Sequence, residues 1–131
     1  KDVIMRMQKT FRDMVKKDGT FNVPDDFSEV IENGKAFIDP GVKMGEGWLL
    51  TGEVVSLIKS GASNIISAQP FGCLPNHIVA KGMVRKIKDQ YPEANIVAID
   101  YDPSASKVNQ ENRIRLMLAN AKLSEEMKAS V

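Results

Sequence analysis

Hydrophobic residues recur at helical spacing in five stretches of the chain. The pattern is clear over 1–17, where Ile4, Met7, Phe11 and Met14 share one face and basic residues occupy the other sides. Over 25–37 the same spacing is weaker, and it becomes clear again further along the chain. The spacing therefore predicts helices, and their ranges are 1–17, 25–37, 46–60, 76–90 and 104–122, the last capped by Ser104.

Two short apolar runs lack this spacing and predict β-strands over 64–68 and 94–100. The helix expected over 76–90 lies between them. A strand, a helix and a strand in this order form a βαβ unit, in which the two strands are parallel and the crossover is right-handed. The expected fold class is therefore α/β: a Rossmann- or flavodoxin-like three-layer unit, with a short parallel sheet flanked by helices.

The sheet predicted in this way is incomplete, because two strands are too few for a stable open sheet. Either residues 20–23 add a strand, or a neighbouring subunit or chain beyond this sequence completes the sheet. We expect a single domain, divided into an N-terminal helical segment over 1–38, an α/β unit over 39–123 and a frayed tail over 124–131. Because the first residue is Lys1, we also expect this sequence to be a fragment of a longer protein.

Composition narrows the classes of partner and compartment. Eighteen basic and seventeen acidic residues leave a net charge of +1, which favours neither nucleic acid nor an anionic membrane as a partner. No apolar run is long enough for a membrane-spanning helix. A single cysteine excludes an internal disulfide framework and an internal site with several cysteine ligands. These features are typical of a reduced, cytoplasmic setting.

Polar and reactive residues follow both predicted strands. Gly72 and Cys73 come after the first strand, and Asp100 and Asp102 come at and after the second. In open parallel sheets, ligands bind outside the carboxyl ends of the strands, and helix N-termini after both loops would point backbone N–H groups at the same crevice. The sequence therefore predicts a binding crevice at this edge.

Cys73 has two interpretations. A position just before a helix favours the thiolate form of a cysteine, and thiolates bind metals. The preceding Gly72 lets the backbone approach a bulky partner. The alternative is a small buried hydrophobic residue, the usual state of a lone cysteine. His77 lies four residues further on; the simpler interpretation is that it bonds a local carbonyl group rather than a metal.

The last predicted helix begins with polar residues on its inward-facing stripe. Gln110 and Arg113 precede the apolar residues of that stripe, and Asn109 and Asn112 accompany them. These side chains either line a crevice suited to carbonyl or phosphate groups, or form a surface that meets another domain or subunit. A glycine-rich stretch over 39–47 contains Lys43, but it matches a phosphate-binding loop poorly.

Three separated motifs resemble a known family. They are Gly-Glu-Gly-Trp-Leu-Leu at 45–50, Gln-Pro-Phe-Gly-Cys-Leu-Pro-Asn-His at 69–77 and Ile-Asp-Tyr-Asp-Pro-Ser-Ala-Ser-Lys-Val-Asn-Gln-Glu-Asn-Arg at 99–113. In this order and spacing they are similar to the C-terminal region of very long bacterial proteins related to activators of 2-hydroxyacyl-CoA dehydratases. The resemblance covers roughly 40–122.

The resemblance implies a role in an ATP-dependent redox system. Such long proteins join an activase of the acetate kinase/actin-like fold, which delivers a low-potential electron through an iron–sulfur cluster, to a region similar to the dehydratase component. In the dehydratases, cysteines at strand ends hold another cluster where the acyl-CoA reacts. Cys73 resembles the last of those cysteines, and Asp100 to Arg113 resembles the C-terminal unit of the dehydratase. The implied partners are the rest of the parent chain, a dehydratase component and an acyl-CoA.

The sequence also departs from that family. It has no second cysteine and no ATP motif of the activase, so the chain alone is expected to hold no cluster and to show no activity. Three hypotheses remain open. Cys73 joins a shared cluster, or the chain is a non-catalytic module that docks the activase or a partner subunit, or the crevice formed by Asp100, Asp102, Gln110 and Arg113 binds the phosphate or acyl group of a CoA ester. A homo-oligomer of this chain is a further form that the sequence leaves open.

Overall fold

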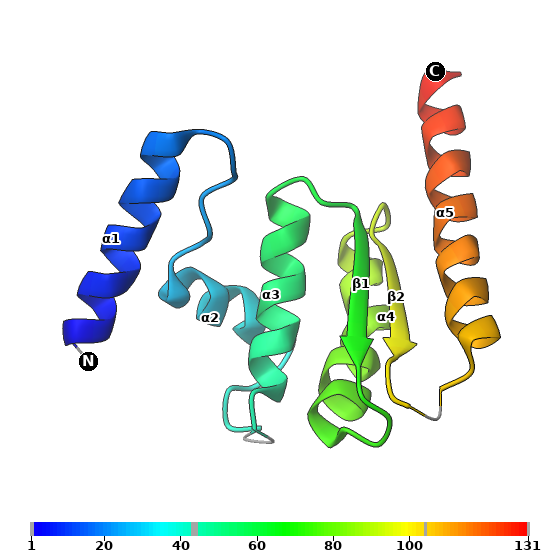
Figure 1. The fold of residues 1–131 in the computed structure, drawn as a ribbon, viewed down its shortest axis with the longest axis horizontal. Helices are drawn as coiled ribbons and strands as arrows, with labels where there is room; N and C mark the ends of the chain where they lie inside the picture. The colour runs from blue at the N-terminus through cyan, green and yellow to red at the C-terminus, as the bar shows by residue number, and fades with distance from the viewer. Residues whose placement is uncertain (1, 43–44, 104, 131) are drawn as a thin grey trace.

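The computed structural model describes residues 2–42, 45–103 and 105–130. Within these residues the fold is mixed α/β, with five α-helices, one π-helical segment and a two-stranded sheet (Figure 1). The strands are β1 (Asn64–Gln69) and β2 (Asn95–Asp100). They are parallel, and Gln69 pairs with Asp100 at their carboxyl ends. The predicted parallel βαβ unit is thus confirmed.

Two helices lie on the same face of the sheet. They are α3 (Gly47–Lys59), which precedes β1, and α4 (Lys81–Gln90), which connects the strands. A π-helical segment, η1 (Pro75–Ala80), leads into α4, so the first part of the predicted helix over 76–90 is wound differently. The buried core between these helices and the sheet consists of Phe37, Val55, Ile58, Ile65, Ile87, Ala94 and Ile96.

The last helix, α5 (Lys107–Ala129), runs beside β2 and extends beyond the strand (Figure 1). Its inward side carries Gln110, Ile114 and Met117, of which Met117 is buried. The predicted helix end at 122 is wrong, because the helix continues to Ala129 through part of the stretch expected to be a tail. The physical reason is that this stretch is rich in good helix formers and has no glycine or proline to end the helix. Ser104 and Lys43 lie outside the described residues.

The N-terminal helix α1 (Asp2–Asp18) stands apart from the sheet (Figure 1). All of its residues are described, and none of them is buried. The apolar face of this amphipathic helix is open: Phe11 is 56% exposed and Met7 68%. An ion pair from Arg12 to Asp26 at 3.2 Å connects α1 to the next helix, α2 (Phe27–Lys35). Residues 20–23 are described and form no strand, so they do not complete the sheet.

Helix α2 begins at a complete capping box. The Asp26 carboxylate accepts a hydrogen bond from the backbone N–H of Ser28 at 3.0 Å, and the Glu29 side chain accepts from the backbone N–H of Asp26 at 2.8 Å. These bonds satisfy backbone donors that have no partner within the helix. The Ser28 side chain, its backbone N–H and the nearby Arg12 together hold the pKa of Asp26 below its ordinary value of 3.8.

Replacement of Asp26 by alanine is expected to lower the melting temperature at neutral pH. A carboxyl group whose pKa is lowered on folding stabilises the protein above its ordinary value, and this contribution disappears as the pH falls through the lowered pKa. The difference in melting temperature between wild type and Asp26→Ala should therefore shrink as the solution is acidified below pH 3.8. Thermal unfolding followed by circular dichroism at several pH values measures it, with the neighbouring Asp25→Ala as the control.

No helix in the described part of the chain has both the length and the apolar character required to cross a membrane.

Candidate functional site

The carboxyl ends of β1 and β2 place a glutamine and an aspartate side by side. The Gln69 side chain is only 2% exposed, although a polar residue at this position costs energy unless it finds a partner. Its amide nitrogen, Nε2, donates a hydrogen bond to Oδ1 of Asp100 at 2.7 Å. The two side chains meet because parallel pairing brings residues in register to the same face of the sheet.

His77, from η1, joins this pair. Its Nδ1 lies 3.0 Å from the backbone carbonyl oxygen of Cys73, and a carbonyl oxygen only accepts, so Nδ1 carries the hydrogen. In the neutral ring Nε2 is then an acceptor, and it lies 3.3 Å from the Gln69 amide nitrogen. The two N–H groups of one amide thus serve His77 and Asp100. The Oδ1 atom of Asp100 is itself 3.6 Å from Nε2 of His77.

Of the contacts that His77 makes, the sequence predicted only the one to a neighbouring backbone carbonyl group. The bond to the Cys73 carbonyl confirms the simpler interpretation of this residue. The contacts to Gln69 and Asp100 were missed, because they depend on where η1 places the imidazole ring relative to the ends of the two strands. Phe71 packs edge-on against the imidazole ring, with the ring centres 6.2 Å apart, and covers one side of it.

Cys73 lies in the loop between β1 and η1 and is partly exposed. The Asn76 side chain donates a hydrogen bond from Nδ2 to Sγ of Cys73 at 3.0 Å. An amide donor at this position stabilises negative charge on sulfur. Gly72, just before it, has a φ of 75°, a left-handed conformation that favours glycine, and a side chain built there would meet nothing within 4 Å. The space beside this turn is therefore open.

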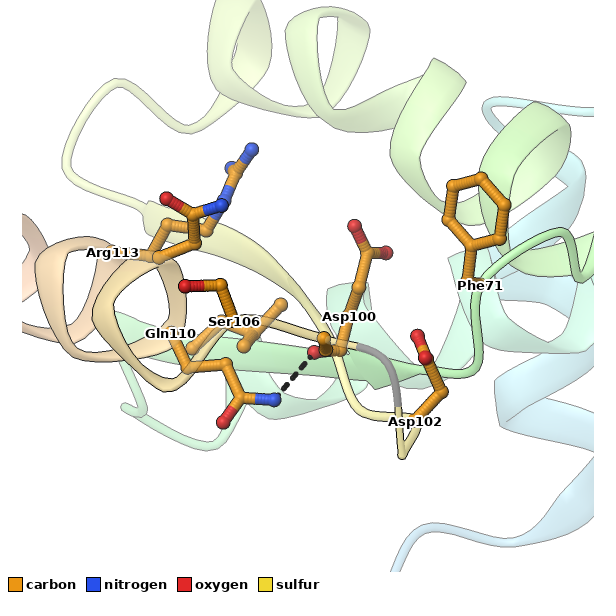
Figure 2. Close-up of a pocket in the computed structure, with 9 residues that line it drawn as sticks. Phe71, Asp100, Asp102, Ser106, Gln110 and Arg113 are labelled. Atoms are coloured by element: carbon orange, nitrogen blue, oxygen red, sulfur yellow. Dashed lines mark hydrogen bonds between the residues drawn. The ribbon is translucent and has the colours of Figure 1, made fainter.

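A pocket of about 350 Å³ opens beside Asp100 at the carboxyl end of β2 (Figure 2). Arg113 and Phe71 lie at opposite ends of it in this view. The pocket brings together four of the six residues predicted for the site, but Cys73 and Gly72 do not line it. Its lining residues are Phe71, Ile99, Asp100, Asp102, Ala105, Ser106, Asn109, Gln110 and Arg113.

Gln110 and Arg113 bind the backbone of the chain's own strand. Nε2 of Gln110 donates to the carbonyl oxygen of Asp100 at 2.9 Å, and a guanidinium nitrogen of Arg113 donates to that of Ala98 at 3.3 Å (Figure 2 shows the first). Backbone bonds from Asn95 and Tyr101 to the β1 side show that odd-numbered residues of β2 face β1. By alternation Ala98 and Asp100 face outwards, so α5 closes the free edge of β2.

Replacement of Gln110 by alanine is therefore expected to loosen α5. Loss of one hydrogen bond to a strand-edge carbonyl costs about 1 kcal/mol of unfolding free energy. The backbone amides at the start of α5 should also exchange with deuterium faster. Urea unfolding and hydrogen exchange measure both effects. Asn109→Ala is the matched control, because Asn109 is the exposed neighbour on the same helix, and equal effects of the two variants would contradict this role.

The residues present do not fit an iron–sulfur cluster held by this chain alone. Among the residues that the structure describes, no group of three His, Cys, Asp or Glu side chains is placed to hold a metal ion. Cys73 offers one sulfur, whereas cubane clusters in proteins are held by four cysteine ligands. Cys73 is therefore the single cysteine ligand that this sequence offers to a shared site.

Comparison with known proteins gives no independent assignment. No family model, no curated protein and no solved structure matches this chain.

Proposed function

We propose that this chain is a Rossmann- or flavodoxin-like unit of a protein related to the activators of 2-hydroxyacyl-CoA dehydratases, and that Cys73 supplies one ligand to an iron–sulfur cluster shared with other parts of that protein. The observation that carries the proposal is the state of Cys73. Its thiol is partly exposed, receives an amide hydrogen bond from Asn76, and stands beside an open glycine turn. A cysteine serving only as core packing would be buried.

The residues around Cys73 have definable roles in this proposal. Asn76 stabilises charge on the sulfur, as hydrogen bonds to cluster ligands do. His77 holds the Cys73 carbonyl and so fixes the direction of the loop, while Gln69 and Asp100 hold His77 in turn. The cysteine loop is thereby anchored to the end of the sheet. The residues that would complete the cluster, a dehydratase component and an acyl-CoA belong to the proposed parent system.

The other two hypotheses gain less from the geometry. Docking through Gln110 and Arg113 would require these side chains to reach a partner, but both bind carbonyl groups of β2. Binding of a CoA phosphate in the pocket would place anionic groups beside Asp100 and Asp102, with Arg113 as the one cation among the lining residues. In the first case the two side chains are already occupied, and in the second the two carboxylates repel an anionic ligand.

The test is anaerobic spectroscopy of the longer protein that contains this sequence, wild type against Cys73→Ser. We expect the broad visible absorbance of an iron–sulfur cluster in the wild type, and its loss or a clear change in the variant. Asn76→Ala should shift the reduction potential while keeping the cluster. An unchanged spectrum and iron content in Cys73→Ser would rule out the ligand role and leave the non-catalytic docking module as the better proposal.

A further inference from the structure

The outer edge of β1 is open, in contrast to that of β2. The carbonyl oxygens of Ser63 and Gln69 accept hydrogen bonds from β2, so odd-numbered residues face the neighbouring strand. By alternation the backbone N–H and C=O groups of Asn64, Ile66 and Ala68 point away from the sheet. All three residues are exposed, and within the described chain these backbone groups meet no partner.

The outer edge of β1 has none of the features that prevent a strand edge from pairing with another strand. Natural proteins protect such edges with charged residues, proline, a bulge or a covering helix. The sequence of β1 is Asn-Ile-Ile-Ser-Ala-Gln, without charge or proline, and its register with β2 is unbroken. Helix α5 covers the edge of β2 and leaves that of β1 uncovered.

The topology explains why no strand of the described chain fills this position. Helices α3 and α4 pack on the same face of the sheet. Since crossovers are right-handed, a strand leading into α3 would lie at the outer edge of β1, just as β1 leads through α4 to β2. Helix α2 stands before α3 instead.

The charge pattern points to a second copy of this chain as the occupant. From Ser60 to Ala80 the sequence contains no Asp, Glu, Lys or Arg, although 27% of the whole chain is charged. Two identical segments therefore meet without like-charge repulsion, and depletion of charge is typical of interface centres. A strand edge can also pair antiparallel with an identical edge, because the backbone donors and acceptors along it alternate.

We propose that β1 pairs antiparallel with β1 of a second copy about a twofold axis at Ile66. In this register Ile66 lies opposite Ile66 of the second copy and Asn64 lies opposite Ala68. All three outward-facing residues then form hydrogen-bonded pairs, and the two sheets become one of four strands, which is a common size. The pairing uses no residue of the Cys73 site, so a test of the pairing is independent of a test of the proposed function.

The experiment is analytical ultracentrifugation of this chain over a range of concentrations. Ile66→Lys places two lysines directly opposite each other and should raise the dimer dissociation constant about tenfold or more. Ala68→Pro removes an outward N–H and leaves the bonds to β2 intact, so it should weaken the dimer without unfolding the sheet. Leu116→Lys on the exposed side of α5 is the control, because Leu116 is 60% exposed, and circular dichroism verifies folding.

Loss of the dimer in both edge variants, with the dimer retained in the control, supports the proposal. Slow deuterium exchange at the Ile66 and Ala68 amides of the dimer supports the stated register. A wild-type chain that is monomeric at every concentration overturns the proposal. A dimer that persists in both edge variants overturns it as well and places the contact on another surface, such as the apolar face of α1.

Discussion

Replacement of Gly52 by alanine is expected to destabilise the chain by about 3 kcal/mol or more, because this position has no room for a methyl group. Gly52 is buried in α3 at the crossing with α2. An added Cβ would overlap the backbone carbonyl oxygen of Val30 and lie 3.3 Å from the backbone nitrogen of Gly34. Both neighbours are backbone atoms, so relief requires the two helices to move apart.

Gly82→Ala is the matched control for this prediction. Gly82 is an exposed helical residue, and an added Cβ would lie 4.0 Å from the carbonyl oxygen of His77. Alanine there should stabilise the chain by about 0.5–1 kcal/mol, since it restricts the unfolded state without a clash. Urea unfolding of the two variants gives both values. A Gly52→Ala chain as stable as the wild type would show that α2 and α3 do not pack at this distance.

Replacement of Ile99 by alanine is expected to cost about 2–5 kcal/mol of unfolding free energy. Ile99 is 0% exposed and lies on the face of β2 that turns away from α3 and α4. Truncation leaves a cavity in that layer and enlarges the pocket beside Asp100, because Ile99 lines it. The loss therefore affects both the stability of β2 and the geometry of the candidate site.

Ile66→Ala is the control, because it changes the same residue type on the same face of the sheet. Ile66 pairs in register with Val97, two residues before Ile99, but it is 45% exposed. Its truncation should cost the monomer about 1 kcal/mol or less. Guanidinium unfolding at a concentration where the chain is monomeric measures the difference. Equal losses in the two variants would contradict the burial of Ile99 by α5.

Sequence patterning predicted most helices and both strands correctly, because the periodicity of apolar residues follows local geometry. It was less reliable about which residues of a helix face inward. Leu57 has the helical spacing of an inward-facing apolar residue of α3, yet it is 46% exposed, whereas Thr51 and Val55 are buried. The difference arises because α3 packs against α2 and η1 as well as the sheet, so its buried face is set by three neighbours.

The candidate site was predicted in part. Because parallel strands end at one edge, Asp100, Asp102, Gln110 and Arg113 could be grouped from sequence, and they share one pocket. The bonds of Gln110 and Arg113 to β2 could not be foreseen, since they depend on where α5 lies. Cys73 was grouped with the same residues, and it connects to Asp100 through His77 instead of lining the pocket.

By itself the sequence determined the order of helices and strands, their parallel pairing, and the placement of Cys73 and Asp100 at one end of the sheet, because these follow from spacing and chain connectivity. Only the tertiary structure decided that Gln69 is buried between His77 and Asp100, that α5 closes the edge of β2, and that the edge of β1 stays open. The physical reason is that backbone and amide groups bond to whatever lies beside them in space, and that neighbour is set by packing between segments distant in sequence.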